Sequence, residues 1–412
     1  MAVSVAIRLG AGFVAFAILA RALGPQDFGV LMLWFSVSIL ASCIPNYGLT
    51  TYVLREVGAN PESAGALINE GVTGKLLLSC IVIAVALLLV GVYADGQALL
   101  VVALLVASIA DTFSEFLNAC IRAKDRFGVE TRLATVSSLL HLGLVALAMI
   151  FMPSTLMAAT AILVSRLCIL GLTVVVMGYV GITVRLVSMR RALERLKAAV
   201  SYGLDFGLQS LFGQIDSVVL NHFSGPAAVG VHQAGMRIFF GGAQLAPILA
   251  NVYLPQIAAS PKLGGQYGWS MQAIFVVFGA LFGVAFALLP RELIVLMFGD
   301  GFAGLAALLP LFGLLFFLRF VAAAWGVLLT AGGEQTYRMG AGVLQWIVIA
   351  VAAFILVPKW ANAGWLMALC IGTAALAVFY FLRAQRHGAK SWAVIGLTAF
   401  GALPFAFLVK VG

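Results

Sequence analysis

Apolar runs of about 20 residues or more follow one another along the chain with only short polar breaks between them. Each run is long enough to cross a hydrocarbon layer of about 30 Å as a helix, and none shows the alternation of a lipid-facing barrel strand. The pattern therefore predicts an all-α polytopic membrane protein with about 13 helices, in a range of 12 to 14, near residues 2–23, 28–54, 67–93, 97–122, 129–151, 155–180, 200–222, 229–258, 270–290, 303–331, 338–358, 362–383 and 391–410.

The break between the first two runs returns in the second half of the chain. In Ala20–Gly29 a Gly-Pro pair is followed by an apolar residue and a second Gly, and Ser224–Gly230 repeats this arrangement. Pro45 and Pro247 then fall at nearly the same distance beyond the two breaks. The chain is predicted to contain two copies of one unit, each beginning with a helix pair joined by a tight Gly-Pro corner.

Basic residues gather in alternate breaks, after the fourth, sixth and twelfth predicted helices. By the positive-inside rule these breaks and the N-terminus face the cytoplasm. Segment 181–200 mixes apolar and basic side chains, which predicts a short amphipathic helix on the membrane surface. Six helices precede it, so the two copies share one orientation and are related by a pseudo-twofold axis along the membrane normal. We expect a six-helix lobe at 1–180, a basic cytoplasmic linker at 181–199, a second six-helix lobe at 200–385 and an extra C-terminal helix at 386–412.

Composition narrows the class of function. The 412 residues are 63% hydrophobic and only 9% charged, with a mean hydropathy of +1.12, which excludes a soluble globule with a polar surface. Five cysteines lie inside apolar runs without CxxC spacing, which favours small apolar side chains over bridges or metal ligands. No P-loop, HExxH motif or metal-ligand cluster is present in the sequence. The basic residues behind the net charge of +9 gather in the breaks between the predicted helices. We therefore expect no cofactor, no nucleic acid partner and no enzyme chemistry.

Carboxylates inside the predicted helices are candidates for ion coupling. Asp111 and Glu115 lie one turn apart on the fourth helix, and Asp205 and Asp216 lie close to three turns apart on the seventh. A charge at the bilayer centre costs at least about 2.5–3.5 kcal/mol, so such residues face a bundle interior or a water-filled cavity. These four side chains are expected to take up protons or Na⁺, or to pair with neighbouring arginines.

Arginines also lie inside the apolar runs of both halves, at Arg8, Arg166, Arg237 and Arg319. A guanidinium stays charged and offers forked donors that match phosphate oxygens. Two interpretations stay open: a cavity for a phosphate-bearing anion, or intramembrane ion pairs with carboxylates that fix helix packing. Arg8 and Asp205 lie near helix ends, so a third interpretation applies to them: their side chains reach to the membrane–water interface.

The two Gly-Pro stretches are similar to a known family. Ala20–Pro25 with Phe28-Gly29, followed by Leu54-Arg55-Glu56, resembles the opening of bacterial polysaccharide flippases of the Wzx type. These flippases belong to the multidrug/oligosaccharidyl-lipid/polysaccharide exporter (MOP) superfamily, which also contains the MATE transporters. The second half agrees with the same family at Asp216, Gly225, Val229-Gly230, Gln233-Ala234, Arg237 and Leu254-Pro255.

The resemblance implies two six-helix lobes around a central cavity that opens alternately to either side of the bacterial inner membrane. The implied substrate is undecaprenyl diphosphate carrying an oligosaccharide repeat unit, for O-antigen, capsule or exopolysaccharide. Arg8 and Arg237 look like the arginines that line the cationic cavity of the related lipid II flippases. Polysaccharide polymerase and chain-length proteins are the implied protein partners, beside the membrane lipids.

Two other functions remain open at this stage. A cation-coupled drug antiporter of the same superfamily would prefer an acidic, aromatic cavity to a cationic one. A membrane glycan polymerase or ligase would need a large outer loop with catalytic Arg or His residues, and the sequence has no loop of that length.

Overall fold

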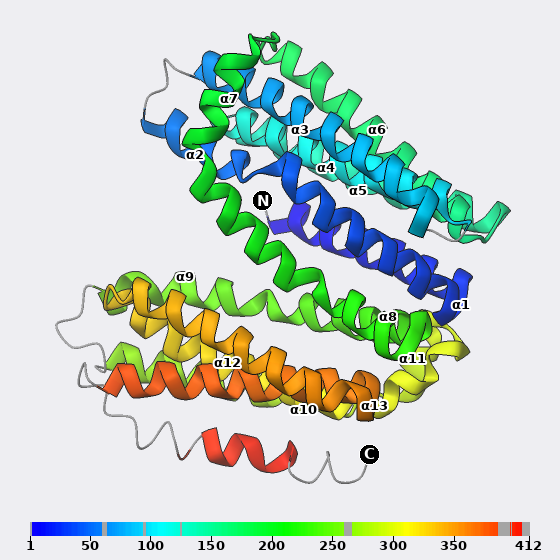
Figure 1. Ribbon diagram of the computed structural model, residues 1–412. Helices are drawn as coiled ribbons and strands as arrows, with labels where there is room; N and C mark the ends of the chain where they lie inside the picture. Colours follow the sequence, from blue (N-terminus) through cyan, green and yellow to red (C-terminus); the bar gives the residue numbers. More distant parts are fainter. Residues whose placement is uncertain are drawn as a thin grey trace. The chain divides into compact units, whose positions relative to one another are not determined.

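The computed structural model describes residues 2–59, 64–93, 96–123, 126–258, 266–385, 396 and 398–405, and every regular element in them is a helix (Figure 1). The chain divides into two compact units, Met1–Asn221 and His222–Gly412. The division falls inside one long helix, α8 (Val200–Ala243), whose first half belongs to the first unit. The predicted lobes 1–180 and 200–385 follow the internal repeat rather than the packing, and they stay a prediction.

The first unit is built around α4 (Ala98–Ala123), most of whose residues are buried. Helix α4 packs against α1 (Ala2–Asn46), α2 (Leu49–Ala59), α3 (Ala64–Tyr93) and α6 (Thr155–Tyr179), and α5 (Phe127–Phe151) packs against α1 and α6. A short helix, α7 (Met189–Ala198), lies beside α3 before the chain enters α8. The polar residues predicted inside the fourth membrane helix therefore lie on the central helix of this unit.

The Gly-Pro corners take the same backbone conformation in both units. Gly24 has φ 69° and ψ 171°, and Gly225 has φ 79° and ψ 177°, a region that is essentially open to glycine alone. In Figure 1 the chain reverses direction at the first corner, so α1 holds two antiparallel helices. The structure confirms that both positions are breaks, and it explains why Gly precedes Pro at each.

One predicted helix is interrupted in the structure. The sequence predicts a continuous helix over 28–54, but the chain breaks at Tyr47-Gly48, where both residues have positive φ, and continues as α2. Gly48 lies against the backbone of Tyr202 at the start of α8, with no room for a Cβ atom. The predicted helix 229–258 is likewise divided near Gln244, between α8 and α9 (Leu245–Ala258).

The second unit has an aromatic core. Helix α12 (Leu309–Ala331) packs against α10 (Gln266–Ala287) and α13 (Gln335–Gln385), and α11 (Arg291–Phe298) and the 3₁₀ helix η2 (Asp300–Leu308) precede α12. Phe312, Phe316, Phe317 and Phe320 of α12 are fully buried. The predicted helix 303–331 thus begins as a 3₁₀ helix rather than an α-helix.

Nine stretches of the described residues are long and apolar enough to cross a membrane. Three of them are 51 to 58 residues long and carry a backbone break, at Gly24, Gly225 or Ala361, so each has the length of two crossings. The chain is a multi-pass membrane protein, and these stretches hold the first twelve predicted helices. Of the thirteenth, predicted near 391–410, residue 396 and residues 398–405 are helical, and the rest lies outside the described residues.

Candidate functional site

A polar cavity of about 170 Å³ lies inside the first unit, among α1, α4, α6 and the first half of α8. Most of its lining side chains carry oxygen, nitrogen or sulfur: Ser42, Cys43, Asn46, Ser108, Asp111, Thr112, Glu115 and Arg166. Phe35, Ile39, Ala107 and Phe206 complete the wall. Polar groups in the apolar part of a membrane bundle mark a pathway or a binding site by default.

Helix geometry explains why α4 supplies both carboxylates. Asp111 and Glu115 are four residues apart, and Ser108 and Thr112 occupy neighbouring positions on the same side of the helix. Asp111 is half exposed to the cavity, and its carboxylate lies 2.8 Å from the guanidinium of Arg166 on α6. The structure thus brings together three of the predicted site residues, and it adopts the ion-paired arrangement for Arg166.

Glu115 is held from α1 and faces several charges. The side chain of Asn46 makes a hydrogen bond to its carboxylate, and Asp111, Lys75 and Arg122 act on it electrostatically. Among the described residues the carbonyl oxygen of Asn46 and the hydroxyl of Ser108 have no hydrogen-bond partner, although both are buried. Buried polar atoms are normally paired, so this wall offers unused oxygen ligands to an ion or water.

Lys75 of α3 is a charged residue of this region that the sequence analysis did not select. Its side chain is 0% exposed, and its ammonium nitrogen has no hydrogen-bond partner in the described part of the chain. The nitrogen lies 5.4 Å and 5.6 Å from the ring centres of Phe113 and Phe116 on α4, which is cation–π distance. A lysine inside a predicted membrane helix is itself a signal, as an arginine there is.

The other two predicted carboxylates lie on the first half of α8. Asp216 is buried and accepts hydrogen bonds from the backbone N–H and the hydroxyl of Ser217, at 2.7 Å and 3.4 Å. The hydroxyl of Ser36 on α1 donates to Ser217, at 3.0 Å, so Asp216 belongs to a buried polar link between α8 and α1. Asp205 is exposed and accepts a hydrogen bond from Gln209, one turn further on.

The remaining predicted arginines are not among the residues that line the polar cavity. Arg8 is an exposed residue of α1 and does not line it. Arg237 on the second half of α8 and Arg319 on α12 belong to the second unit, and both side chains are exposed. Of the four predicted arginines, Arg166 is the one that lines the polar cavity.

His141 is bonded within the first unit, and the cysteines are free thiols. The Nδ1 atom of His141 on α5 lies 2.8 Å from the hydroxyl of Ser165 on α6. All five cysteines are free, but Cys80 and Cys168 are exposed rather than buried. Among the described residues no group of His, Cys, Asp and Glu has the number of ligands that a metal site needs.

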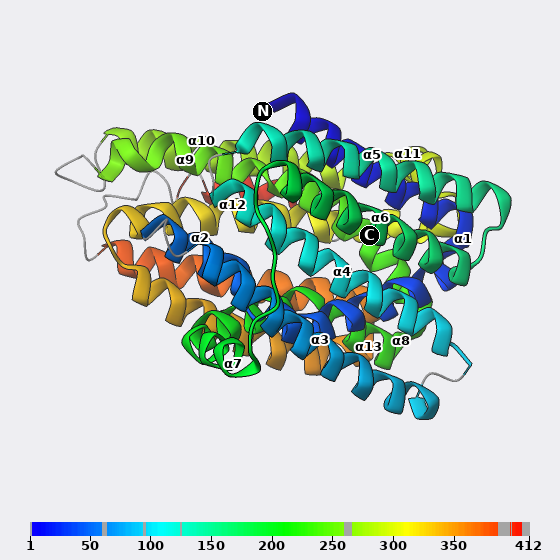
Figure 2. The ribbon, with the colours of Figure 1, turned by 90° about the horizontal axis from the view of Figure 1, so that it is seen from above.

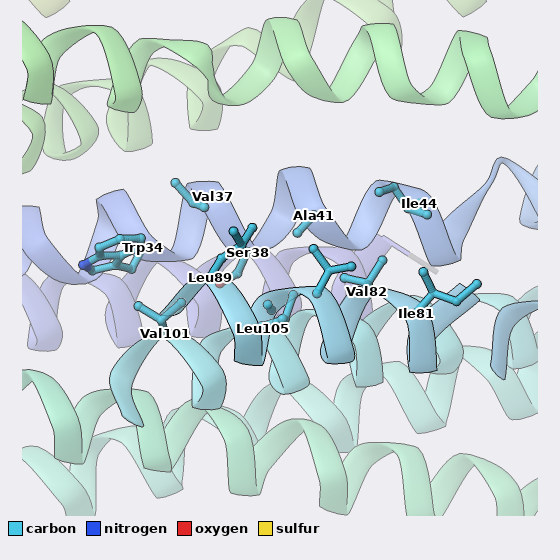
Figure 3. A pocket seen from close by; sticks show the side chains of 12 residues that line it. Trp34, Val37, Ser38, Ala41, Ile44, Ile81, Val82, Leu89, Val101 and Leu105 are labelled. Atoms are coloured by element: carbon cyan, nitrogen blue, oxygen red, sulfur yellow. The ribbon is translucent and has the colours of Figure 1, made fainter. Parts of the chain in front are cut away.

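A second cavity in the first unit has the opposite character. Its volume is about 370 Å³, and side chains of α1, α3 and α4 line it, almost all of them aliphatic (Figure 3). Its polar exceptions are the Ser38 hydroxyl and the Trp34 indole, whose N–H donates to the Gln97 side chain at 2.5 Å. This cavity offers nothing to a charged group, so within the first unit the candidate site for an ion or an anion is the polar cavity.

Comparison with protein families identifies the family of this chain. The family described as polysaccharide biosynthesis protein matches residues 1–260, which is more than half of the chain. This chain belongs to that family. No curated protein matches the sequence.

Several solved structures have a fold similar to that of this chain. The lipid II flippase MurJ in an inward closed conformation superposes with a TM-score of 0.79 at 9% identity, over 98% of this chain and 91% of that chain. An inward-facing multidrug resistance MATE family transporter of the MOP superfamily gives 0.69 at 18% identity, over 96% and 98%. A MOP superfamily transporter from Pyrococcus furiosus with a binding pocket of reverse polarity gives 0.59 at 16%, over 96% and 95%. The fold is that of the MOP superfamily.

Proposed function

We propose that this protein is a flippase that moves undecaprenyl-diphosphate-linked oligosaccharide units across the bacterial inner membrane by alternating access. The observation that carries the proposal is membership of the polysaccharide biosynthesis family in a chain with a MOP transporter fold. The product would feed O-antigen, capsule or exopolysaccharide synthesis, in contact with polymerase and chain-length proteins. The positive-inside rule puts the basic breaks after the fourth, sixth and twelfth helices in the cytoplasm. An even number of crossings separates each of these breaks from the N-terminus, so the N-terminus would lie in the cytoplasm too.

In this mechanism the diphosphate replaces a carboxylate as the partner of Arg166. The Asp111 carboxylate neutralises the Arg166 guanidinium within the polar cavity. A diphosphate offers more oxygens and more negative charge to the same forked donors. Arg8, Arg237 and Arg319 are the other proposed contacts of the diphosphate during the cycle, and no covalent bond changes.

Ion coupling is assigned first to the polar cavity. Asp111 and Glu115 share it with the buried, unpaired oxygens of Asn46 and Ser108, which suits a proton or a Na⁺ ion as the coupling species. Uptake of an ion by these carboxylates would weaken the hold of Asp111 on Arg166. Asp205 and Asp216 are the second pair of candidates, and Asp216 would act through its link to Ser36.

The first experiment deletes the gene and measures lipid-linked oligosaccharides by mass spectrometry. We expect undecaprenyl diphosphate glycans to accumulate and the surface polymer to disappear. A plasmid copy should restore both, and Arg166→Ala at normal expression should restore neither. Unchanged lipid-linked glycans in the deletion strain would refute the proposal.

A second candidate function is a drug antiporter of the MOP superfamily. The observation in its favour is that two carboxylates face one guanidinium in the polar cavity, an arrangement that suits a cationic substrate. The same deletion strain would then show normal surface polymer and greater sensitivity to cationic drugs.

A further inference from the structure

Helix α7 is fastened to α3 by an ion pair. The guanidinium of Arg195 lies 2.7 Å from the carboxylate of Glu70 and donates a hydrogen bond to the hydroxyl of Tyr52, at 2.8 Å. Burial opposes the charge of Arg195, but the bonds to Tyr52 and Glu70 outweigh it and raise the pKa of Arg195 above its ordinary value. Ala192 and Leu196 of α7 are buried, and Leu196 packs against Gly74 of α3.

The extended segment before α7 is tied to the same helix. The backbone N–H of Arg185 donates to the Asn69 side chain at 2.7 Å, and that of Val187 donates to the Thr73 hydroxyl at 3.1 Å. Figure 2 shows α7 beside α3, as the packing of the two helices requires. The linker therefore has a fixed place on the first unit. Its inward side faces α3, and its outward side faces away from α3.

The linker lies at one end of α3, between two membrane crossings. With 30 residues, α3 is about 45 Å long, whereas the hydrocarbon layer is about 30 Å thick. The excess length leaves one or both ends of α3 outside the hydrocarbon, and Asn69, Glu70 and Thr73, which hold the linker, lie in its first ten residues. The chain leaves one crossing at Tyr179, the end of α6, and enters the next at Val200, the start of α8, so the linker connects two crossings at this end.

The outward side of the linker is basic and apolar at once, and we call it the linker face. Arg190 is 90% exposed, and the one acid of α7, Glu194, is paired with it at 3.1 Å and exposed as well. Arg191 and Lys197 are also exposed on α7. The linker face consists of the exposed residues Arg185, Leu186, Met189, Arg190, Arg191, Leu193, Glu194 and Lys197, four basic side chains against one acid.

We propose that the linker face binds the headgroups of anionic phospholipids. A surface that places basic side chains beside apolar ones at headgroup level matches a negative leaflet in charge, while Leu186, Met189 and Leu193 enter the acyl boundary. Arg195 takes no part, because it lies on the inward side of α7, where it is bonded to Glu70 and Tyr52. This site is separate from the polar cavity and does not depend on which substrate the protein carries.

Lipid binding to the purified full chain tests this without any transport assay. Native mass spectrometry in detergent, with phosphatidylglycerol and phosphatidylcholine titrated in turn, should show preferential retention of phosphatidylglycerol. Neutralising three exposed cations, as Arg190→Gln/Arg191→Gln/Lys197→Gln, should weaken that retention about fivefold for each charge removed, which corresponds to about 1 kcal/mol per basic residue. The charge-preserving Arg190→Lys/Arg191→Lys variant should retain it.

Two control variants distinguish binding at the linker face from a general effect of charge and from a loss of folding stability. Arg291→Gln/Lys359→Gln removes two exposed cations outside the linker and should leave the preference unchanged. Glu70→Gln loosens the anchor and should lower thermal stability while the basic side chains remain. Equal retention of both lipids by the native chain, or full preference in the triple variant, would overturn the proposal. Loss of surface polymer in a triple variant that still prefers phosphatidylglycerol would point to another occupant and overturn it too.

Discussion

At the scale of single residues, the pair formed by Arg166 and Asp111 separates function from stability. Their side chains are 26% and 51% exposed, so the pair contributes about 1 kcal/mol or less to folding. An effect of these residues on transport would therefore come from lost recognition rather than from lost structure.

Replacing Arg166 should remove transport and leave the fold intact. We expect Arg166→Ala to abolish surface polymer with a nearly unchanged melting temperature, and Arg166→Lys to keep part of the polymer, because an ammonium keeps the charge but not the fork. Immunoblots of surface polymer and thermal melts of the purified variants measure the two quantities. Normal polymer in the alanine variant would remove Arg166 from the proposed site.

Lys75 allows a test of a buried charge. A buried ammonium without a hydrogen-bond partner is costly, and an apolar side chain of similar length is often neutral or stabilising in its place. We expect Lys75→Met to melt at the same temperature as the native protein or higher. Lys75→Ala, which leaves a cavity against Phe113 and Phe116, should lose about 2–4 kcal/mol.

Transport by the two variants decides whether Lys75 has a function. Lys75 acts electrostatically on Glu115, so a stable Lys75→Met protein that fails to restore surface polymer would place this lysine in the coupling machinery. A stable variant with full transport would leave Lys75 a structural residue.

The sequence predicted part of this site and could not predict the rest. Asp111, Glu115 and Arg166 were found because a charge in an apolar run stands out, and helical spacing put both carboxylates on one side of α4. Asn46 and Ser108 were missed because short polar residues are common in membrane helices, and only packing shows that their oxygens are buried without partners. Which carboxylate meets Arg166 likewise depends on how α6 packs against α4.

At the scale of elements, the glycine breaks are the features that local sequence determines best. Gly24 and Gly225 have open space around the position of a Cβ atom, so a side chain there meets only the backbone restriction. The break at Tyr47-Gly48 has no Gly-Pro signal and depends on the approach of Tyr202, from about 150 residues further along the chain. That distance along the chain is why the helix at 28–54 was predicted to be continuous.

Alanine at the two corners should therefore destabilise both helix pairs by similar amounts. We expect Gly24→Ala and Gly225→Ala each to cost about 1–3 kcal/mol, the strain of a positive φ with extended ψ. Gly10→Ala and Gly213→Ala are the matched controls, since these glycines lie in the same two helices, also with open space, and should cost nothing. Thermal melts of the four variants give the comparison, and equal melting temperatures throughout would show that the corners are not strained.

At the scale of the whole molecule, hydropathy predicted the class and the first twelve crossings. These follow from the length of apolar runs, which the bilayer itself sets. The packing division inside α8 could not be read from the repeat, because it depends on contacts that the first half of α8 makes with α1 and α2, such as those of Ser217 and Tyr202.

Coupling belongs to this scale because it requires both sides of the membrane. In vesicles with purified protein we expect transport to respond to an imposed pH or Na⁺ gradient, and Glu115→Gln to remove that response, since an amide can neither take up a proton nor carry the charge. Asp205→Asn is the comparison variant, because Asp205 is exposed and bonded to Gln209 instead of lining the polar cavity. Transport by the native protein that is indifferent to both gradients would remove the coupling role of the carboxylates.

The corner at Gly24 also bears on how the protein is made. Helical residues run to its N-terminal side and resume immediately after it, so no loop separates the first two crossings. Without a loop, the first crossing cannot span the bilayer while the second is still inside the ribosome. We therefore expect the translocon to release this pair into the lipid as one hairpin, so that a nascent chain truncated just after the corner would remain unintegrated.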